Sequence, residues 1–182
     1  MSGEPSVRAG AVWIQGAGEL ASGAAWRLIR AGYLVVMAEA PRPRLVRRLV
    51  SFGEAVYAGR VEVEGIPGRL VPADAAGFAP GEAIVIVDPG ATQLPRLRPA
   101  AVVDGRMTKQ RPVPLPAGPS PVIGLGPGFT CGQEAALVIE TQRGPRLGAV
   151  IDTGAAAPDT GVPGATRSRR GCAVGAGCAD RR

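Results

Sequence analysis

Residues 11–40 read AVWIQGAGELASGAAWRLIRAGYLVVMAEA, and this stretch decides the fold. AVWIQ (11–15) is an apolar run followed by a glycine, which is typical of a buried strand. The next residues predict a helix that stops near Gly32, and YLVVMA (33–38) predicts a second strand. A helix between two buried strands predicts a right-handed parallel β-α-β crossover. The apolar helix face comprises Leu20, Ala21, Ala24, Ala25, Leu28 and Ile29, whereas Ser22, Arg27 and Arg30 lie off that face.

The rest of the chain is rich in short strands and poor in helices. RLVRRLV (44–50) predicts a short amphipathic helix, and VEVEGIPGRLV (61–71) predicts a β-hairpin because it alternates around turn residues. Short apolar runs with Gly, Pro or Asp at their edges predict further strands: 83–87, 100–103, 121–125, 136–140 and 147–151. The predicted fold class is therefore α/β, with a Rossmann-like β-α-β unit at 11–40 and a strand-rich region at 55–164, within a single body spanning 1–164.

The composition excludes several classes of protein. The chain has 182 residues, 46% of them hydrophobic, which is enough to bury a core. It contains no histidine, so a Ser-His-Asp triad, a Cys-His protease and a His-ligated zinc site are excluded, and we predict no metal site. Three cysteines provide no disulfide framework, which favours a reducing compartment. Because the sequence shows neither a secretory signal nor an apolar stretch of membrane-spanning length, we expect a cytoplasmic protein without membrane contact.

The net charge of +6 at pH 7 is concentrated at the C-terminus. Residues 165–182, ATRSRRGCAVGAGCADRR, hold five Arg and one Asp, which leaves a net charge of only +2 for residues 1–164. A nearly balanced body argues against nucleic acid as a partner. The basic tail has no apolar periodicity, so we expect it to be disordered. A frameshift or truncation would explain its abrupt change in composition.

The first candidate site is the turn Gly16-x-Gly18-x-x-Ala21 between the first strand and the helix. Glu39 ends the second strand, at the distance along the chain that dinucleotide-binding β-α-β units show. In such units the glycines admit phosphate close to the backbone at the helix N-terminus, and the acid accepts hydrogen bonds from ribose hydroxyls. Glu19 would repel a bound pyrophosphate unless a cation lay between them. The alternative is that the glycines serve only close strand-helix packing.

The second candidate site is the glycine-rich loop in PVIGLGPGFTCG (121–132), which follows a predicted strand. Successive backbone N–H groups around Gly124, Gly126 and Gly128 can cradle an anion, and Thr130 adds a hydroxyl. The loop lacks the lysine of a Walker motif. A tight turn between strands explains the same residues equally well.

The third candidate is Asp104 in VVDGRMTK (102–109). A carboxylate at the carboxyl end of a strand can contact a ligand in an open α/β sheet, and Arg106 and Lys109 follow it closely. The alternative is that Asp104 caps the following turn. Cys131 is either a thiol activated by nearby backbone N–H groups or a small buried apolar side chain.

Five separated segments agree in order with one known family. They are IQGAGELASGAAWRLIRAGYLVVMAEAPRPRLVRRLVSFGEAVYAGRVEVEGIPGRLV, VVDGRMTK, VIGLGPGFTCG, VIETQRG and LGAVI. The chain therefore resembles the YqeB family of selenium-dependent molybdenum hydroxylase system proteins. The resemblance implies an accessory protein for maturing molybdenum hydroxylases, which carry a molybdopterin cofactor and labile selenium. It also implies the hydroxylase apoenzyme as a partner, and it assigns no catalytic residue.

Residues and resemblance together favour one function and leave two alternatives open. We expect an accessory factor in the maturation of selenium-dependent molybdenum hydroxylases that binds a phosphate-bearing ligand, either a nucleotide or the molybdopterin cofactor. Gly16, Gly18 and the Gly124–Gly128 loop would hold its phosphate. One alternative is an NAD-type oxidoreductase in which Lys109 or Tyr57 supplies a proton. The other is an interaction protein whose glycines are purely structural, so catalysis stays an open question.

Overall fold

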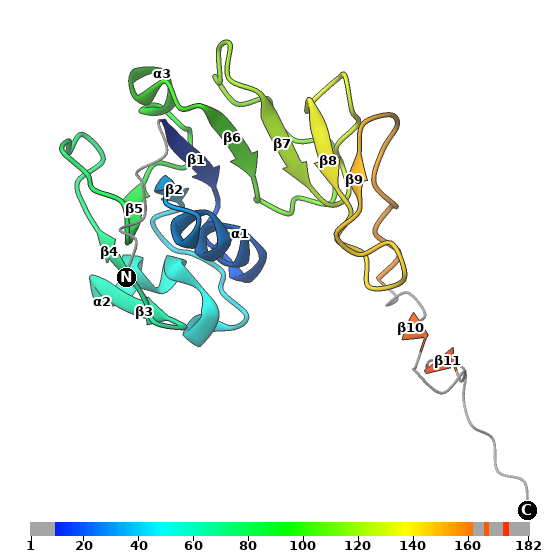
Figure 1. The fold of residues 1–182 in the computed structure, drawn as a ribbon, viewed down its shortest axis with the longest axis horizontal. Coiled ribbons are helices and arrows are strands. Elements are labelled where there is room, and N and C mark those ends of the chain that lie inside the picture. The colour runs from blue at the N-terminus through cyan, green and yellow to red at the C-terminus, as the bar shows by residue number, and fades with distance from the viewer. Residues whose placement is uncertain (1–9, 162–165, 168–172, 175–182) are drawn as a thin grey trace, which may run out of the picture.

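The computed structural model describes residues 10–161 together with 166–167 and 173–174. In this part of the chain, one large sheet carries a single long helix, α1 (Glu19–Arg30), against one of its faces (Figure 1). None of the helices among these residues has the length and apolar character that crossing a membrane requires.

The predicted β-α-β unit is present. β1 (Ala11–Gln15) and β2 (Leu34–Glu39) pair in parallel, and α1 connects them. The helix ends because Gly32 adopts a positive φ of 85°, a conformation that glycine accepts without strain. Its N–H then bonds the carbonyl of Ile29 at 2.9 Å, which caps the last turn. The mixed α/β fold with a Rossmann-like beginning is thus confirmed.

The elements after β2 are short. A hairpin forms from β3 (Arg60–Val63) and β4 (Ile66–Leu70), as the alternating sequence predicts. The remaining strands lie within or beside the predicted apolar runs: β5 (Ala83–Val87), β6 (Ala101–Asp104), β7 (Val122–Leu125), β8 (Leu137–Ile139) and β9 (Val150–Ile151). The remaining helical turns are η1 (Arg48–Val50), η2 (Phe52–Glu54), α2 (Ala55–Ala58) and α3 (Leu94–Leu97).

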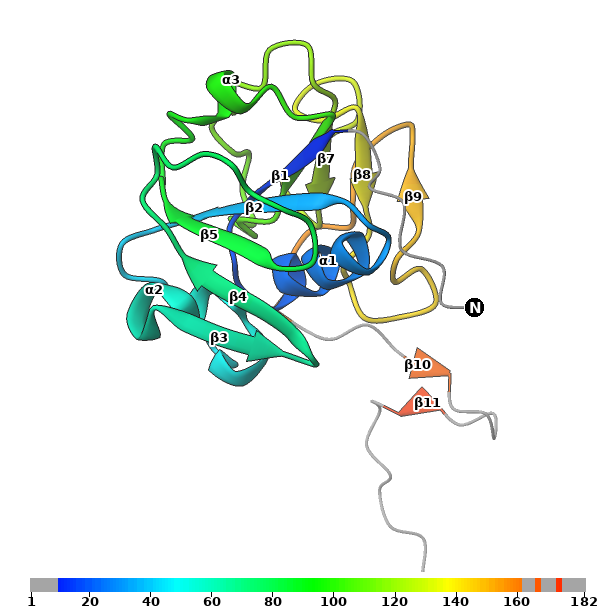
Figure 2. The ribbon, with the colours of Figure 1, turned by 60° about the vertical axis from the view of Figure 1, so that its left-hand side comes forward.

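The nine strands form one sheet in the order β3-β4-β5-β2-β1-β6-β7-β8-β9. All neighbours from β4 to β8 pair in parallel, whereas β3 and β9 are antiparallel edge strands at opposite ends (Figures 1 and 2). The chain first extends the sheet on one side of β1 and then returns to place β6 on the other side. The strand order therefore reverses between β1 and β6.

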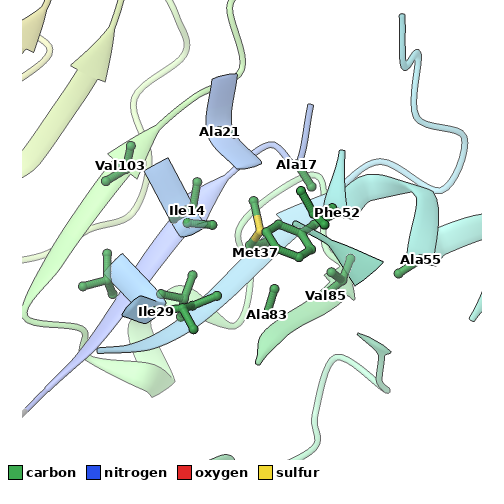
Figure 3. Close-up of a cluster of buried hydrophobic side chains, with 14 of the residues drawn as sticks. Ile14, Ala17, Ala21, Ile29, Met37, Phe52, Ala55, Ala83, Val85 and Val103 are labelled. Atoms are coloured by element: carbon green, nitrogen blue, oxygen red, sulfur yellow. The ribbon is translucent and has the colours of Figure 1, made fainter. Parts of the chain in front are cut away.

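Both faces of the central strands are buried, as parallel strands require. One apolar cluster lies beneath α1, where Ile14, Met37 and Val85 from three strands meet Ala21 and Ile29 of the helix (Figure 3). A second cluster covers the opposite face and comprises Trp13, Val36, Ala38, Val71, Ile84, Ile86, Ala91, Leu94 and Val102. Phe52 of η2 closes the first cluster and is fully buried.

Two local predictions are wrong. Residues 44–50 form no amphipathic helix: only the short η1 turn is helical, and the side chains of Val46 and Leu49 are 91% and 89% exposed. Ser22 is fully buried, although its position off the apolar stripe predicts exposure. Its hydroxyl is satisfied by two hydrogen bonds, one donated to the carbonyl of Ala17 at 3.1 Å and one accepted from the N–H of Phe52 at 2.8 Å.

The predicted tail, 165–182, falls largely outside the described residues. The described exceptions are β10 (Thr166–Arg167) and β11 (Ala173–Val174), which pair antiparallel with each other. The expectation of disorder elsewhere in the tail stays a prediction.

Candidate functional site

The carboxyl ends of the central strands surround a cavity of about 650 Å³. The β1–α1 turn, the end of β2, the loop after β5 and the segment after β6 all line it. The cavity therefore lies where the strand order reverses. Open α/β sheets bind their ligands at this position, because the loops on the two sides of the reversal diverge and leave a crevice.

Gly16 is required by the fold of the turn itself. Its φ is 94°, in the region that favours glycine, and its N–H donates to the carbonyl of Ala38 at 2.7 Å. A Cβ at this position would lie 3.0 Å from the carbonyl oxygen of Gly105, the residue after β6. Close packing of the two neighbouring strand ends thus explains Gly16 without a ligand.

Gly18 has no such explanation. Its backbone is extended, with φ −70° and ψ −179°, which any residue adopts. A Cβ there would meet no atom within 4 Å, yet the residue lines the cavity. Gly18 precedes α1 directly and provides no side-chain cap for the helix. Gly18, Glu19 and Leu20 at the start of the helix all line the cavity, and Gly18 places no side chain beside the first backbone N–H groups.

Ala21 occupies the third small position of the motif and packs α1 onto the sheet. It is buried, and a Cβ added to Gly105 would lie only 2.9 Å from the Cβ of Ala21. The N–H of Gly105 in turn donates to the carbonyl of Gln15 at 2.8 Å. The close approach of helix to strand that the motif predicts is therefore present, and it is made possible by the glycine directly after β6.

Glu39 lies at the end of β2, in the wall of the cavity. Its two carboxylate oxygens accept hydrogen bonds from the backbone N–H of Ala17 at 2.6 Å and from that of Ala40 at 2.7 Å. A carboxylate offers about four acceptor positions, so these two bonds leave capacity for a ligand hydroxyl. Glu39 both braces the glycine turn and presents an acceptor to the cavity.

Glu19 lines the same cavity but is partly neutralised. Its carboxylate lies 3.3 Å from Nε of Arg47, and the side chains of Arg47 and Glu19 are 61% and 41% exposed. An exposed ion pair reduces the repulsion that a bare carboxylate would exert on phosphate. Three cationic residues also line the cavity, namely Arg44, Arg106 and Lys109.

Residues 44–46 line the cavity, and hydrogen bonds of the flanking residues hold this segment in place. Arg48 donates two hydrogen bonds to the carboxylate of Glu54, which lowers the pKa of that carboxyl. The hydroxyl of Tyr57 donates to the carbonyl of Pro43 at 2.7 Å. These contacts accompany an irregular segment in place of the predicted helix.

Gln15 is a site residue that the motif does not reveal. It is buried at the base of the cavity, where its amide oxygen accepts from the indole N–H of Trp13 at 2.9 Å. Its amide nitrogen donates to the carbonyls of Asp88 at 3.2 Å and Pro89 at 3.3 Å. Gln15 thereby links β1 to the loop after β5. A polar residue at the end of an otherwise apolar strand is the signal that could have identified it.

Asp104 lies at the end of β6 but is engaged within the chain. It is buried, and its carboxylate accepts hydrogen bonds from the backbone N–H and the guanidinium of Arg106. Arg106 also donates to the carbonyl of Val113 at 2.7 Å. The residues that line the main cavity include Arg106 but not Asp104. This geometry matches the turn-capping alternative, and contact of Asp104 with a ligand stays a prediction.

The glycine-rich loop after β7 lies outside the main cavity lining. Side chains at Gly124 and Gly126 would overlap the ring of Phe129 and the hydroxyl of Thr141, and one at Gly128 would overlap the carbonyl of Gln110. The N–H of Gly126 donates to Ile139, and the N–H of Thr130 donates to the carboxylate of Glu134, both at 2.9 Å. Each glycine therefore has a packing reason, and anion binding by this loop stays a prediction.

The thiol of Cys131 lies close to two backbone carbonyls. The residue is half-buried and has no disulfide partner among the described residues. Its thiol lies within hydrogen-bonding distance of two carbonyls, that of Asp152 at 2.9 Å and that of Ala136 at 3.1 Å. It thus links the residues before β8 to those after β9.

Comparison with known proteins identifies one relative. The chain is 45% identical over 161 residues to the uncharacterized protein YqeB of Escherichia coli (strain K12). The match covers 84% of this chain and 29% of that protein, so the chain spans less than a third of the length of the relative. No family model matches the chain, and no solved structure matches it.

Proposed function

The chain belongs to the YqeB family, and we propose that it is an accessory factor in the maturation of selenium-dependent molybdenum hydroxylases that binds a phosphate-bearing ligand. The ligand is a nucleotide or the molybdopterin cofactor, which share a phosphate group. It occupies the cavity at the β1–α1 turn, with its phosphate at the start of α1.

Gly18 carries this proposal. Gly16 and Gly105 are explained by contacts within the chain, whereas Gly18 has neither a strained backbone nor a neighbour that excludes a side chain. Neither its backbone conformation nor its neighbours require a glycine at this helix start. A ligand that approaches the backbone closely would explain the glycine. The purely structural alternative accounts for the other glycines of the two motifs and leaves Gly18 unexplained.

The charges of the cavity suit an anion at one end and a hydroxylated group at the other. Helix α1 directs its positive end and its unpaired first N–H groups toward the cavity. Glu39 lies at the end of the neighbouring strand, where its acceptors suit a ribose diol. This placement is the observation that favours an NAD-type oxidoreductase as the second candidate function.

Calorimetric titration with ADP, NAD and the molybdopterin cofactor tests the proposal. We expect at least one of these probes to bind, and we expect Gly18→Val to abolish binding because the added methyl groups would cover the first N–H groups of α1. Gly23→Val is the matched control, since Gly23 lies on the exposed side of the same helix with open space around its Cβ position. If the unaltered chain binds none of the probes, the phosphate site is wrong.

The partner is tested separately. The resemblance implies a molybdenum hydroxylase apoenzyme, so we expect the chain to co-elute with a cofactor-free hydroxylase in size-exclusion chromatography. Separate elution at micromolar concentrations of both proteins would contradict the accessory role and favour a stand-alone enzyme.

A further inference from the structure

The segment after β6 adopts an unusual backbone conformation beside the main cavity. Met107 and Lys109 have φ values of 53° and 63°, in the left-handed region that residues with side chains rarely occupy. Both residues line the cavity. Such conformations persist only where surrounding contacts impose them, and they concentrate at ligand-binding positions.

Identifiable contacts impose this conformation. The side chain of Met107 packs against the cluster beneath α1. On one side of it Arg106 is held by Asp104 and Val113, and on the other side Thr108 donates a hydrogen bond to the carbonyl of Gln110 at 2.8 Å. These contacts therefore fix the backbone in the conformation that places Lys109 in the lining of the cavity.

Lys109 lies at the boundary of two cavities. Besides the main cavity, it lines a smaller one of about 150 Å³ formed with residues around Pro127, Thr141 and Pro158. Its ammonium lies 2.8 Å from the carboxylate of Asp159, and this hydrogen bond lowers the pKa of Asp159. The Lys109 side chain is 61% exposed, so the ion pair is in contact with solvent.

This ion pair differs from the pair between Arg106 and Asp104, in which Arg106 also lines the cavity. The guanidinium of Arg106 is committed to a carboxylate that is only 2% exposed, and removing a charge from such a buried partner is costly. The pair between Lys109 and Asp159 is exposed, and exposed pairs contribute little to stability. A lysine ammonium is also a compact charge on a flexible stem, which can turn to a new anion without losing its position on the backbone.

We propose that Lys109 is the exchangeable cation of the site: when a phosphate-bearing ligand enters the main cavity, the ammonium leaves Asp159 and pairs with an anionic group of that ligand. The inference rests on the proposed function, since it requires a ligand at the β1–α1 turn. It assigns Lys109 a role in selecting anionic ligands, and it makes Asp159 the competitor that holds the ammonium in the absence of ligand.

Two substitutions that break the same ion pair separate this role from a structural one. Lys109→Met should weaken ADP binding about tenfold, the value of one charge-assisted contact, and Lys109→Arg should restore part of it. Asp159→Asn should strengthen ADP binding, because it removes the competing carboxylate. A purely structural ion pair would instead make the two variants alike in ADP affinity and in melting temperature. Arg98→Met is the matched control, an exposed cation with φ 46° that precedes β6 instead of following it.

A chemical measurement gives an independent readout, because Lys109 is the only lysine of the 182 residues. Its rate of acetylation can be followed by mass spectrometry, with the N-terminal amine as internal reference. At an ADP concentration about ten times Kd, we expect acetylation of Lys109 to slow about tenfold while the reference is unchanged, since the label reports unoccupied protein.

If ADP binds without protecting Lys109 and binds Lys109→Met equally well, this inference is wrong and the proposed phosphate site stands. If ADP, NAD and the molybdopterin cofactor all fail to bind the unaltered chain, both are wrong.

Discussion

The carboxylate of Glu39 accepts a hydrogen bond of 2.6 Å from the backbone N–H of Ala17, so the last residue of β2 braces the turn that follows β1. Strand pairing brings the two together, because Gln15 lies opposite Ala38 in the parallel register. The same carboxylate is the acceptor that a ribose would use. In the proposed site, bracing of the turn and selection of the ligand would therefore depend on one side chain.

Glu39→Ala should weaken NAD binding several-fold, because it removes the acceptor for the ribose diol and the brace of the turn. The affinity for inorganic pyrophosphate should rise, because the cavity loses a negative charge. Calorimetry with both ligands measures the two effects. Glu62→Ala, at an exposed position on β3, is the control. Equal NAD affinities for the altered and unaltered chains would count against a dinucleotide in this cavity.

The β-α-β unit could be predicted because its signals are local. The apolar runs on either side of α1 and the glycine at its end are read within thirty residues, and Glu39 follows at a distance set by the unit itself. The same local reading failed for 44–50, where Arg48 bonds Glu54 outside the segment and the preceding Pro43 accepts a hydrogen bond from Tyr57. A seven-residue amphipathic pattern is too short to form a stable helix against such contacts.

The features of the site that could not be predicted from the sequence depend on contacts between residues that are far apart in the chain. Ser22 is buried because Phe52, thirty residues later, donates a hydrogen bond to its hydroxyl. Lys109 meets Asp159 fifty residues further on, in a stretch without periodicity. The glycines around Gly126 resemble an anion loop in sequence, yet the space beside them is filled by the ring of Phe129, the side chain of Thr141 and the backbone of Gln110. Local spacing identifies a turn but not the atoms that surround it.

Ser22→Ala should destabilise the fold by about 1–3 kcal/mol, because the buried N–H of Phe52 would lose its acceptor. Urea denaturation followed by circular dichroism measures the change. Ser120→Ala is the control, since its half-buried hydroxyl makes one bond to the carbonyl of Pro99. If the free energy of unfolding is unchanged in Ser22→Ala, the hydroxyl does not join the glycine turn to η2.

Gly124→Ala should also destabilise the fold by about 1–3 kcal/mol, because the added methyl group would overlap the buried ring of Phe129. Adding Phe129→Leu should recover part of the loss, and the coupling between the two changes is measured in a double-mutant cycle. Gly90→Ala is the control, since its Cβ position lies 3.6 Å from the nearest atom. Unchanged ADP affinity would assign Gly124 to packing, whereas a loss of affinity at unchanged stability would assign it to the ligand.

Glu140 should make the stability of the strand-rich half dependent on pH. Burial raises the pKa of this carboxyl, but hydrogen bonds from the backbone N–H groups of Ala157, Gln142 and Thr141, together with the charge of Arg146, lower it overall. A pKa that is lower in the folded state means that the ionised carboxylate stabilises the fold above about pH 4.5, the ordinary value, and that this contribution is lost as the pH falls through the folded pKa.

Glu140→Gln should therefore lower the free energy of unfolding by about 1–3 kcal/mol at pH 7, because the amide accepts fewer and weaker hydrogen bonds than the buried carboxylate. The difference between the two proteins should shrink as the pH falls below about 4.5, the ordinary value, and should disappear below the lowered folded pKa, where the unaltered side chain is also neutral. Urea denaturation between pH 3 and pH 7 measures both curves, with Glu62→Gln as the exposed control. If the free energies of unfolding of the two proteins run parallel over the whole pH range, the Glu140 carboxylate does not stabilise the contact between the segment after β9 and the end of β8.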